Sequence, residues 1–323
     1  MRLAARVLLL LVAASIALAL AAEAGLRLAG VVPTIGLGDV PLGITVGHPT
    51  RGWALAPSAA VAYAGVWTRS NRLGLRAAPL GGDAPVAVLA LGDELTFGWG
   101  VRDDETYPAR LEAELHARWP SCGRVVNGGV PGYTSYQGLM LLRELGGALR
   151  PAVVAAAFHL NDALLDGPGP GAASVIERAL DPWLRRASAL YGWARTRRSV
   201  PPPGWWTAEA RTSPGRYLRD LRAMDAESRR IGATLVLVNV GFAPGLPDPA
   251  PRLRRGELES DYHSITRQVA ASDHIALAEF VGRDVDAHTM LDGVHPNAEG
   301  YRRMATVVGD AIAGLGVLDG RTP

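Results

Sequence analysis

Apolar runs alternate with amphipathic stretches from residue 85 onward, and this alternation predicts strands and helices in turn. The runs are apolar along nearly their whole length, which is typical of strands covered by helices on both faces. Strands that alternate with helices favour an α/β fold with a mainly parallel sheet. The five expected strands are 85–91, 124–127, 152–158, 234–240 and 275–280.

Helical periodicity fills the gaps between these strands. Thr134 and Gln137 can form a capping box at the start of one helix, and Asn297 can cap the last long helix. Another helix follows Pro108 and carries apolar residues on one face, at Leu111, Leu115 and Trp119. We therefore expect helices between successive strands, which form the outer layers of a three-layer α/β/α sandwich.

The N-terminus has a different pattern. Arg2 and Arg6 precede an apolar run of 16 residues, from Val7 to Ala22, which only Ser15 interrupts. A positive flank followed by an apolar run with an Ala-rich end is typical of an export signal. As a helix the run is about 24 Å long, slightly shorter than a hydrocarbon core of roughly 30 Å. Residues 1–24 are thus expected to be a signal peptide or a membrane anchor of an exported protein, and cleavage is left open.

Two further segments interrupt the α/β pattern. Residues 25–83 are rich in Gly and Pro, and we expect an irregular or hairpin lead-in before the main domain at 84–318. Within that domain, 163–213 contains the loop text "DGPGPG" and "PPPGWW" around a helix expected near 174–196. Ligands of open α/β folds bind at the carboxyl ends of the strands. This segment is therefore interpreted as a lid-like insertion over the ligand end.

Composition excludes some classes of function. The formal net charge is only +2, which argues against a nucleic-acid binder, because such proteins normally show a concentrated basic face. The histidines lack the spacing of metal ligands, and Cys122 is the only cysteine. We expect neither nucleic acid, nor a metal, nor any other cofactor as a partner. The sequence does not predict the oligomeric state.

Polar residues that can carry chemistry follow the expected strands or precede the last helix. They lie in "GDELTFG" (92–98), "NGGVPGY" (127–133), "FHLND" (158–162) and "DGVHPN" (292–297). In a parallel sheet these strand ends meet at one edge. Asp292 lies three residues before His295, which allows its carboxylate to hold the imidazole in one tautomer. We therefore expect one site formed by Glu94, Gly129, Asn161, Asp292 and His295.

The order and spacing of these stretches resemble the SGNH (GDSL-type) hydrolase superfamily, whose four blocks supply Ser, Gly, Asn and His. The resemblance covers roughly 84–316 and implies a flavodoxin-like three-layer α/β/α fold. It also implies ester hydrolysis or acyl transfer on an acylated carbohydrate or lipid. By this resemblance Gly129 and Asn161 are oxyanion or binding residues, while Asp292 and His295 are catalytic.

Two positions differ from the family pattern. His159 stands where the third block has glycine, so this side chain is a candidate for the cleft. Glu94 stands where the nucleophilic serine is expected. A carboxylate there can fill the oxyanion hole, which makes the domain a catalytically silent binding protein. Alternatively it can attack an sp³ carbon, or act as general base toward a water. The remaining alternatives are a relocated hydroxyl, for which Thr96 is the nearest residue, and acyl transfer by some other arrangement.

Together these observations predict an exported, membrane-tethered hydrolase, esterase or acyl transferase with Glu94 at its active centre. Its expected substrate is an ester of an envelope glycan or lipid. The alternative is a silent binding protein of an envelope polysaccharide or lipid system.

Overall fold

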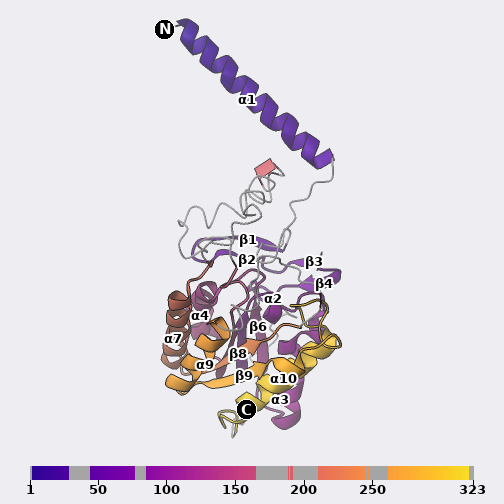
Figure 1. Cartoon of the computed structure of the whole chain (residues 1–323), viewed down its shortest axis with the longest axis vertical. Coiled ribbons are helices and arrows are strands. Elements are labelled where there is room, and N and C mark those ends of the chain that lie inside the picture. Colours follow the sequence, from indigo (N-terminus) through magenta and orange to yellow (C-terminus); the bar gives the residue numbers. More distant parts are fainter. Residues whose placement is uncertain are drawn as a thin grey trace.

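The central sheet has five parallel strands in the order β6-β5-β7-β8-β9, with helices on both faces (Figure 1). The computed structural model describes residues 2–28, 44–76, 85–164, 188, 190–191, 210–243, 246 and 261–319. The sheet strands are β5 (Val86–Gly92), β6 (Arg124–Gly129), β7 (Val153–Ala157), β8 (Thr234–Val240) and β9 (Ala276–Phe280). The predicted α/β/α architecture and its five-stranded sheet are confirmed.

The helices form one layer on each face of the sheet. On one face α3 packs against α10 and β6, and on the other α7 packs against α4, α9 and β8. In the described residues the helices of the α/β domain are α2 (Glu94–Phe97), α3 (Tyr107–Arg118), α4 (Ser135–Leu149), α7 (Pro214–Arg230), α9 (His263–Ser272) and α10 (Ala298–Ala313). The described part of the chain also has two short 3-10 turns, η1 (Asp103–Glu105) and η3 (Gly282–Asp284).

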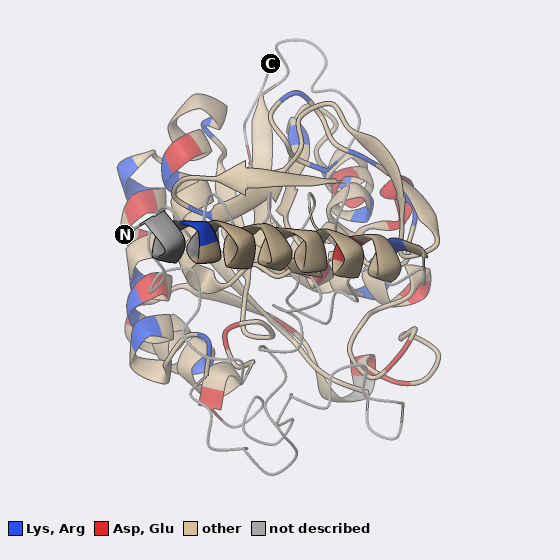
Figure 2. Ribbon diagram, turned by 90° about the horizontal axis from the view of Figure 1, so that it is seen from above, with Lys and Arg blue, Asp and Glu red and all other residues tan. Residues whose placement is uncertain are grey.

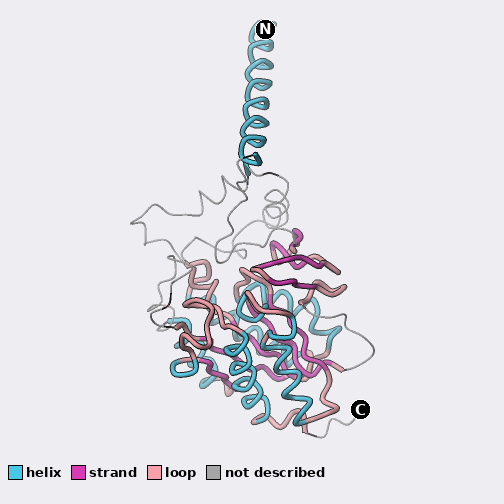
Figure 3. The backbone as a smooth tube through the Cα atoms, turned by 90° about the vertical axis from the view of Figure 1, so that its right-hand side faces the viewer, coloured by secondary structure: helices cyan, strands magenta, loops and turns pink. Residues whose placement is uncertain are grey.

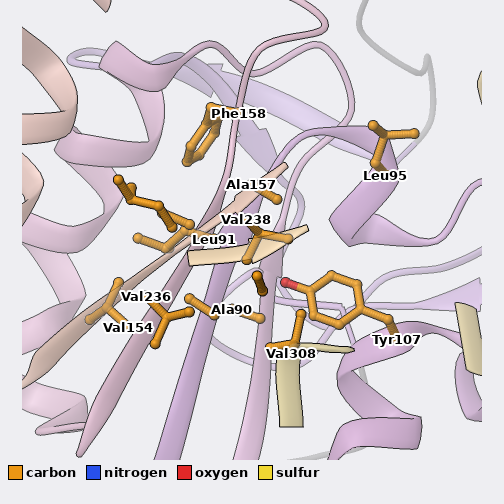
Figure 4. Packing of buried hydrophobic residues seen from close by; sticks show 14 of the residues in the cluster. Ala90, Leu91, Leu95, Tyr107, Val154, Ala157, Phe158, Val236, Val238 and Val308 are labelled. Atoms are coloured by element: carbon orange, nitrogen blue, oxygen red, sulfur yellow. The ribbon is translucent and has the colours of Figure 1, made fainter. Parts of the chain in front are cut away.

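Small and branched apolar side chains fill the space between the layers. Figure 4 shows Ala90, Leu91, Val154, Val236 and Val238 on neighbouring strands of the sheet. All of them are buried, as expected for parallel strands covered on both faces. The capping residues also behave as predicted: Thr134 and Gln137 form a capping box at α4, and the Asn297 side chain accepts hydrogen bonds from the first turn of α10.

The lead-in to the domain contains two antiparallel hairpins. One consists of β1 (Thr45–His48) and β2 (Gly52–Leu55), the other of β3 (Ala60–Tyr63) and β4 (Val66–Arg69). Both lie at the same end of the α/β domain, near α2 (Figure 1). Because α2 follows the carboxyl end of β5, the hairpins lie at the end of the sheet where ligands of such folds bind.

The N-terminal helix α1 (Arg2–Leu28) is longer than the expected segment 1–24 and projects away from the domain (Figures 1 and 3). Residues 9–28 have a mean hydropathy of 2.2, and none of this window is buried. Charged side chains occur only near the two ends of α1, as Figure 2 shows. Length and composition make this helix a candidate membrane span. The lid-like insertion and its expected helix near 174–196 fall mostly outside the described residues.

Candidate active site

Glu94 is the first residue of α2, directly after β5. Asp93 caps this short helix, because its carboxylate accepts the Leu95 N–H at 2.9 Å. The turn requires glycine at position 92, where a Cβ would lie 2.0 Å from the Thr96 hydroxyl. Glu94 itself is only 1% exposed. The sharp turn thus holds its carboxylate inside the protein, at the carboxyl end of the sheet.

One oxygen of the Glu94 carboxylate takes two hydrogen bonds and the other takes none. The Gly132 N–H donates to Oε2 at 2.9 Å, and the Asn161 side-chain amide donates to the same atom at 2.8 Å. Oε1 is buried and receives no hydrogen bond within the described part of the chain. Two donors that converge on one oxygen form the arrangement that stabilises an oxyanion. Here Oε2 occupies that position.

The prediction that the Gly129 amide points into the site is wrong. Gly129 is still a strand residue, paired with Gly92, and its N–H donates to the Asn127 side-chain oxygen at 2.9 Å. Glycine is needed there for another reason, since a Cβ would lie 2.2 Å from the Phe97 nitrogen. The chain leaves the sheet after Gly129, so the amide that turns toward Glu94 is that of Gly132, whose φ is +81°. Gly132 is the last glycine of "NGGVPGY", and this glycine was the feature of the sequence that could have identified the donor.

Asp292 and His295 form the expected pair. Asp292 Oδ2 lies 2.8 Å from His295 Nδ1, and Asp292 Oδ1 accepts the His295 N–H at 2.8 Å. Burial alone would raise the pKa of Asp292, but the hydrogen bonds from His295 outweigh it and hold this pKa below its ordinary value. His295 is 1% exposed, and its Nε2 has no hydrogen-bond partner in the described residues. The carboxylate thus fixes the ring and leaves Nε2 for other chemistry.

Trp99 connects the Glu94 and His295 parts of the site. Its ring stacks on the imidazole of His295 at 4.9 Å between centroids, and its backbone N–H donates to the Glu94 carbonyl at 3.1 Å. Sequence reasoning did not find Trp99. This contact brings the segment after α2 and the segment before α10 together, as the predicted site requires.

Other buried carboxylates surround these groups. Burial, followed by the charge of Glu94, raises the pKa of Asp93 well above its ordinary value. Asp162 follows Asn161 and accepts the Ser135 hydroxyl at 2.6 Å and the Ser135 N–H at 3.0 Å. Burial raises the pKa of Asp162 to about 6. Asp162 ties the turn that carries Asn161 to the start of α4, a role that the sequence did not predict.

His159, the candidate residue for the cleft, packs against two other rings in the structure. It is fully buried, and its ring packs at 4.6 Å from the ring of His263 and 6.1 Å from that of Phe242. Burial and then His263 lower the pKa of His159 well below its ordinary value. The imidazole is therefore a neutral group that packs between the end of β7 and α9.

Thr96 does not supply a relocated hydroxyl. Its side chain is buried over Gly92 and lies 3.4 Å from the Leu91 carbonyl, to which it donates. The hydroxyl faces the backbone of β5, so the structure argues against Thr96 as the nucleophile.

The lead-in braces both loops of the site. Arg76 is buried and donates to the carbonyls of Phe97 and Val101, each at 2.7 Å, which fixes the chain after α2. On the other loop, the Trp53 indole donates to the Pro131 carbonyl at 3.1 Å. Pro131 directly precedes Gly132, so this contact helps to hold the amide that binds Glu94.

Comparison with known families agrees with this geometry. Residues 90–303, more than half of the chain, match the model of the GDSL-like lipase/acylhydrolase family. The chain belongs to this family. Family membership agrees with the parallel sheet covered by helices on both faces. No curated protein matches the chain.

Several solved structures are similar to this GDSL-like chain. TesA has 22% identity and a TM-score of 0.48, with 71% of this chain and 99% of that chain covered. LAE5, an alpha/beta hydrolase from the metagenome of Lake Arreo, Spain, has 21% identity, a TM-score of 0.47 and coverages of 73% and 98%. The psychrotrophic esterase EstA from Pseudoalteromonas has 18% identity, a TM-score of 0.47 and coverages of 71% and 97%.

Proposed function

We propose that this GDSL-like chain is a hydrolase in which the Glu94 carboxylate is the nucleophile. The carboxylate is proposed to attack an sp³ carbon that bears a leaving group. In an ester of an envelope glycan or lipid, this is the alkyl carbon bonded to the ester oxygen. The observation that carries the proposal is the asymmetry of the carboxylate: Oε2 holds both hydrogen bonds, and Oε1 holds none within the described residues. A nucleophilic carboxylate needs one oxygen free to attack and the other one positioned.

In the first step Oε1 attacks the carbon, and the bond to the leaving group breaks. The leaving group departs with the bonding electrons, and an alkyl ester forms on Glu94. For an ester substrate the leaving group is its carboxylate, so this step needs no oxyanion hole for the substrate carbonyl. The carbonyl oxygen of the new ester is Oε2, which already lies between the Gly132 N–H and the Asn161 amide.

In the second step a water attacks the carbonyl carbon of the ester, which is the former carboxylate carbon of Glu94. His295 Nε2 takes the proton of this water, and Asp292 stabilises the imidazolium that results. Negative charge develops on Oε2, where both donors stabilise it. Collapse of this intermediate releases the alcohol, which takes the proton from His295, and restores the Glu94 carboxylate. The net reaction is the hydrolysis of the substrate by one water.

The same donors argue against direct attack of a water on the substrate carbonyl with Glu94 as general base. That reaction places an oxyanion on the substrate and requires donors for it. Gly132 and Asn161 already bind the Glu94 carboxylate. A substrate oxyanion would have to displace a carboxylate of the same charge.

One observation favours a second candidate function, that of a silent binding protein. Glu94 and His295 are both almost completely buried. A carboxylate that fills the oxyanion hole and is covered by its neighbours can have a purely structural role. In that case the domain would bind an envelope glycan or lipid without turnover.

Oxygen-18 labelling distinguishes these alternatives. The probe is 1,2-epoxy-3-(4-nitrophenoxy)propane, an electrophile with an sp³ carbon, incubated in oxygen-18 water with the protein in excess. Attack by Glu94 predicts the label in the Glu94 carboxylate, found by peptide mass spectrometry, and an unlabelled first-turnover diol. Label in the diol alone would support general-base chemistry. If neither turnover nor an adduct is detected, the result would support the silent binding protein.

Export and membrane attachment are also part of the proposal. The apolar window 9–28 and its position near the N-terminus support a helix that is inserted in a membrane. We expect the full chain to sediment with membranes and to resist extraction at alkaline pH. Release into the soluble fraction after removal of residues 1–28 is the expected control result, whereas extraction of the full chain by alkali would contradict an anchor.

A further inference from the structure

A hollow lies outside the Glu94 site. It has a volume of about 1000 Å³ and lies between the β3–β4 hairpin, the turn at η1, and β6. Trp67 lines it from β4, with Arg69 on the same strand and Asp104 on the turn opposite. Among the strongly exposed large hydrophobic residues of the described chain, Trp67 is the one aromatic side chain, at 71% exposure. We propose that this hollow, the Trp67 groove, binds an uncharged oligosaccharide.

The charges of the Trp67 groove argue against a polyanion. Arg69 and Arg76 both pair with Asp103, at 3.2 Å and 3.1 Å. Arg102 pairs with Asp104 at 3.2 Å, and Arg124 of β6 likewise pairs with an acidic residue. Each guanidinium therefore faces a carboxylate, and the groove has little of the single-sign field that attracts polyanions.

The same ion pairs argue against a lipid chain. Arg69 and Asp104 have side chains 64% and 67% exposed, so water solvates them. A hydrocarbon chain in the groove would remove this water and supply no hydrogen bonds in return, which is unfavourable. The groove suits a ligand that replaces those hydrogen bonds.

A sugar ring meets both requirements. Each hydroxyl donates and accepts, so neighbouring hydroxyls can pair with a carboxylate and a guanidinium together. The flat indole of Trp67 can cover the apolar face of the ring, because Trp offers a large rigid surface at small entropic loss. The volume of the groove is at the upper end of ordinary ligand pockets, which fits several sugar units rather than one.

The groove also adjoins the Glu94 site. Arg76 and Asn127 line it, and both donate to the Phe97 carbonyl at the end of α2. Tyr63 of the same hairpin packs against Trp99, which stacks on His295. A bound oligosaccharide would therefore lie next to the residues that fix the chain at the end of α2. The inference rests on the proposed function in one respect, because that function gives an envelope glycan or lipid as the substrate class. The groove then favours the glycan.

Calorimetric titration of the full chain in detergent micelles tests this proposal, with cellohexaose, xylohexaose and chitohexaose as probes. At least one hexasaccharide should bind, and Trp67→Ala should weaken its binding about tenfold, as expected for a central aromatic contact. Trp67→Phe should retain part of the affinity. The matched control is Val46→Ala, which removes an exposed apolar side chain on the other hairpin and should change nothing.

The outcomes distinguish a failure of the groove proposal from a failure of the proposed nucleophile. Glu94→Gln should keep the wild-type affinity for the hexasaccharide and lose turnover, so turnover that persists with intact binding would refute the proposed nucleophile alone. If no hexasaccharide binds, or if Trp67→Ala binds like the wild type, the groove proposal is overturned. It is also overturned if Trp67→Ala only lowers the binding of the chain to phosphatidylglycerol vesicles, because Trp67 would then contact lipid.

Discussion

The side-chain amide of Asn161 donates to the Glu94 carboxylate, with 2.8 Å between Nδ2 and Oε2. Both residues are buried, and they come from the carboxyl ends of the neighbouring strands β7 and β5. A hydrogen bond to a buried charged acceptor is stronger than one between neutral groups. This bond should therefore contribute to stability as well as to the position of the carboxylate.

We expect Asn161→Ala to lower the free energy of unfolding by about 1.5–3 kcal/mol, because it leaves a buried anion with one donor fewer. In a Glu94→Gln background the same substitution should cost only about 0.5–1.5 kcal/mol, since the acceptor is neutral. Urea unfolding of the four proteins measures the coupling. The matched control is Asn239→Ala, another buried Asn, whose effect should be independent of residue 94. Equal losses for Asn161→Ala in both backgrounds would contradict the prediction.

Replacing Glu94 by serine should reveal the oxyanion hole. Glu94→Ser frees the Gly132 N–H and the Asn161 amide and supplies a hydroxyl as the nucleophile. Hydrolysis of 4-nitrophenyl acetate should rise above the wild-type rate by at least about a hundredfold, the scale associated with oxyanion donors. Glu94→Ala frees the same donors without a hydroxyl and should stay at the wild-type rate. Indistinguishable rates for the two variants would mean that His295 is badly placed to activate residue 94.

The fold could be predicted from the sequence because its signals are local. The strand at 234–240 was predicted with its observed bounds, since an apolar run between polar ends is short and self-contained. Likewise the capping residues Thr134 and Asn297 act within one helical turn. By contrast, β6 continues to Gly129, two residues beyond the prediction, because pairing with β5 holds two glycines that have no strand propensity of their own.

The site was predicted less completely because its geometry depends on tertiary contacts. Asp292 and His295 are close in sequence, and their hydrogen bond follows from that spacing. Which glycine faces Glu94 depends instead on where β6 leaves the sheet, and the sequence does not mark that point. Trp99 was missed for a similar reason, since the imidazole on which it stacks is almost two hundred residues away along the chain.

Gly129 and Gly147 should respond oppositely to alanine. At Gly129 a Cβ would lie 2.2 Å from the Phe97 backbone nitrogen, so Gly129→Ala must displace α2. We expect a loss of about 1–3 kcal/mol in the free energy of unfolding. Gly147 lies in α4 with nothing within 4 Å of the added Cβ, and Gly147→Ala should gain about 0.5–1 kcal/mol. Thermal or urea unfolding checks both, and a neutral Gly129→Ala would show that α2 can move away from β6.

Asp162 should make stability depend on pH. Its pKa is raised from 3.8 to about 6 in the folded protein, so the folded state binds this proton more tightly than the unfolded state. The stabilising contribution is fully present below pH 3.8 and is lost as pH rises through about 6. Over this interval Asp162 should lower the free energy of unfolding by about 3 kcal/mol at most.

Urea unfolding at several pH values between these limits, for the wild type and for Asp162→Asn, measures this contribution. The difference between the two proteins isolates Asp162 from other titrating groups, such as Asp93. The wild type should lose more stability than the variant as pH rises. Parallel pH profiles would show that Ser135 and the neighbouring groups compensate for the buried charge.

His295 and Asp292 should be needed for the second step of the proposed reaction and not for the first. With 1,2-epoxy-3-(4-nitrophenoxy)propane, His295→Ala should still form the ester on Glu94, because Oε1 attacks without a base. Hydrolysis of this ester requires the imidazole, so the adduct should accumulate, and peptide mass spectrometry should find it on Glu94. Asp292→Asn should hydrolyse the adduct more slowly than the wild type, because the ring loses its anionic partner. Glu94→Gln should show no adduct at this position. Labelling confined to exposed carboxylates such as Asp310, whose side chain is 64% exposed, would mean that the probe reacts with the surface instead of the active site.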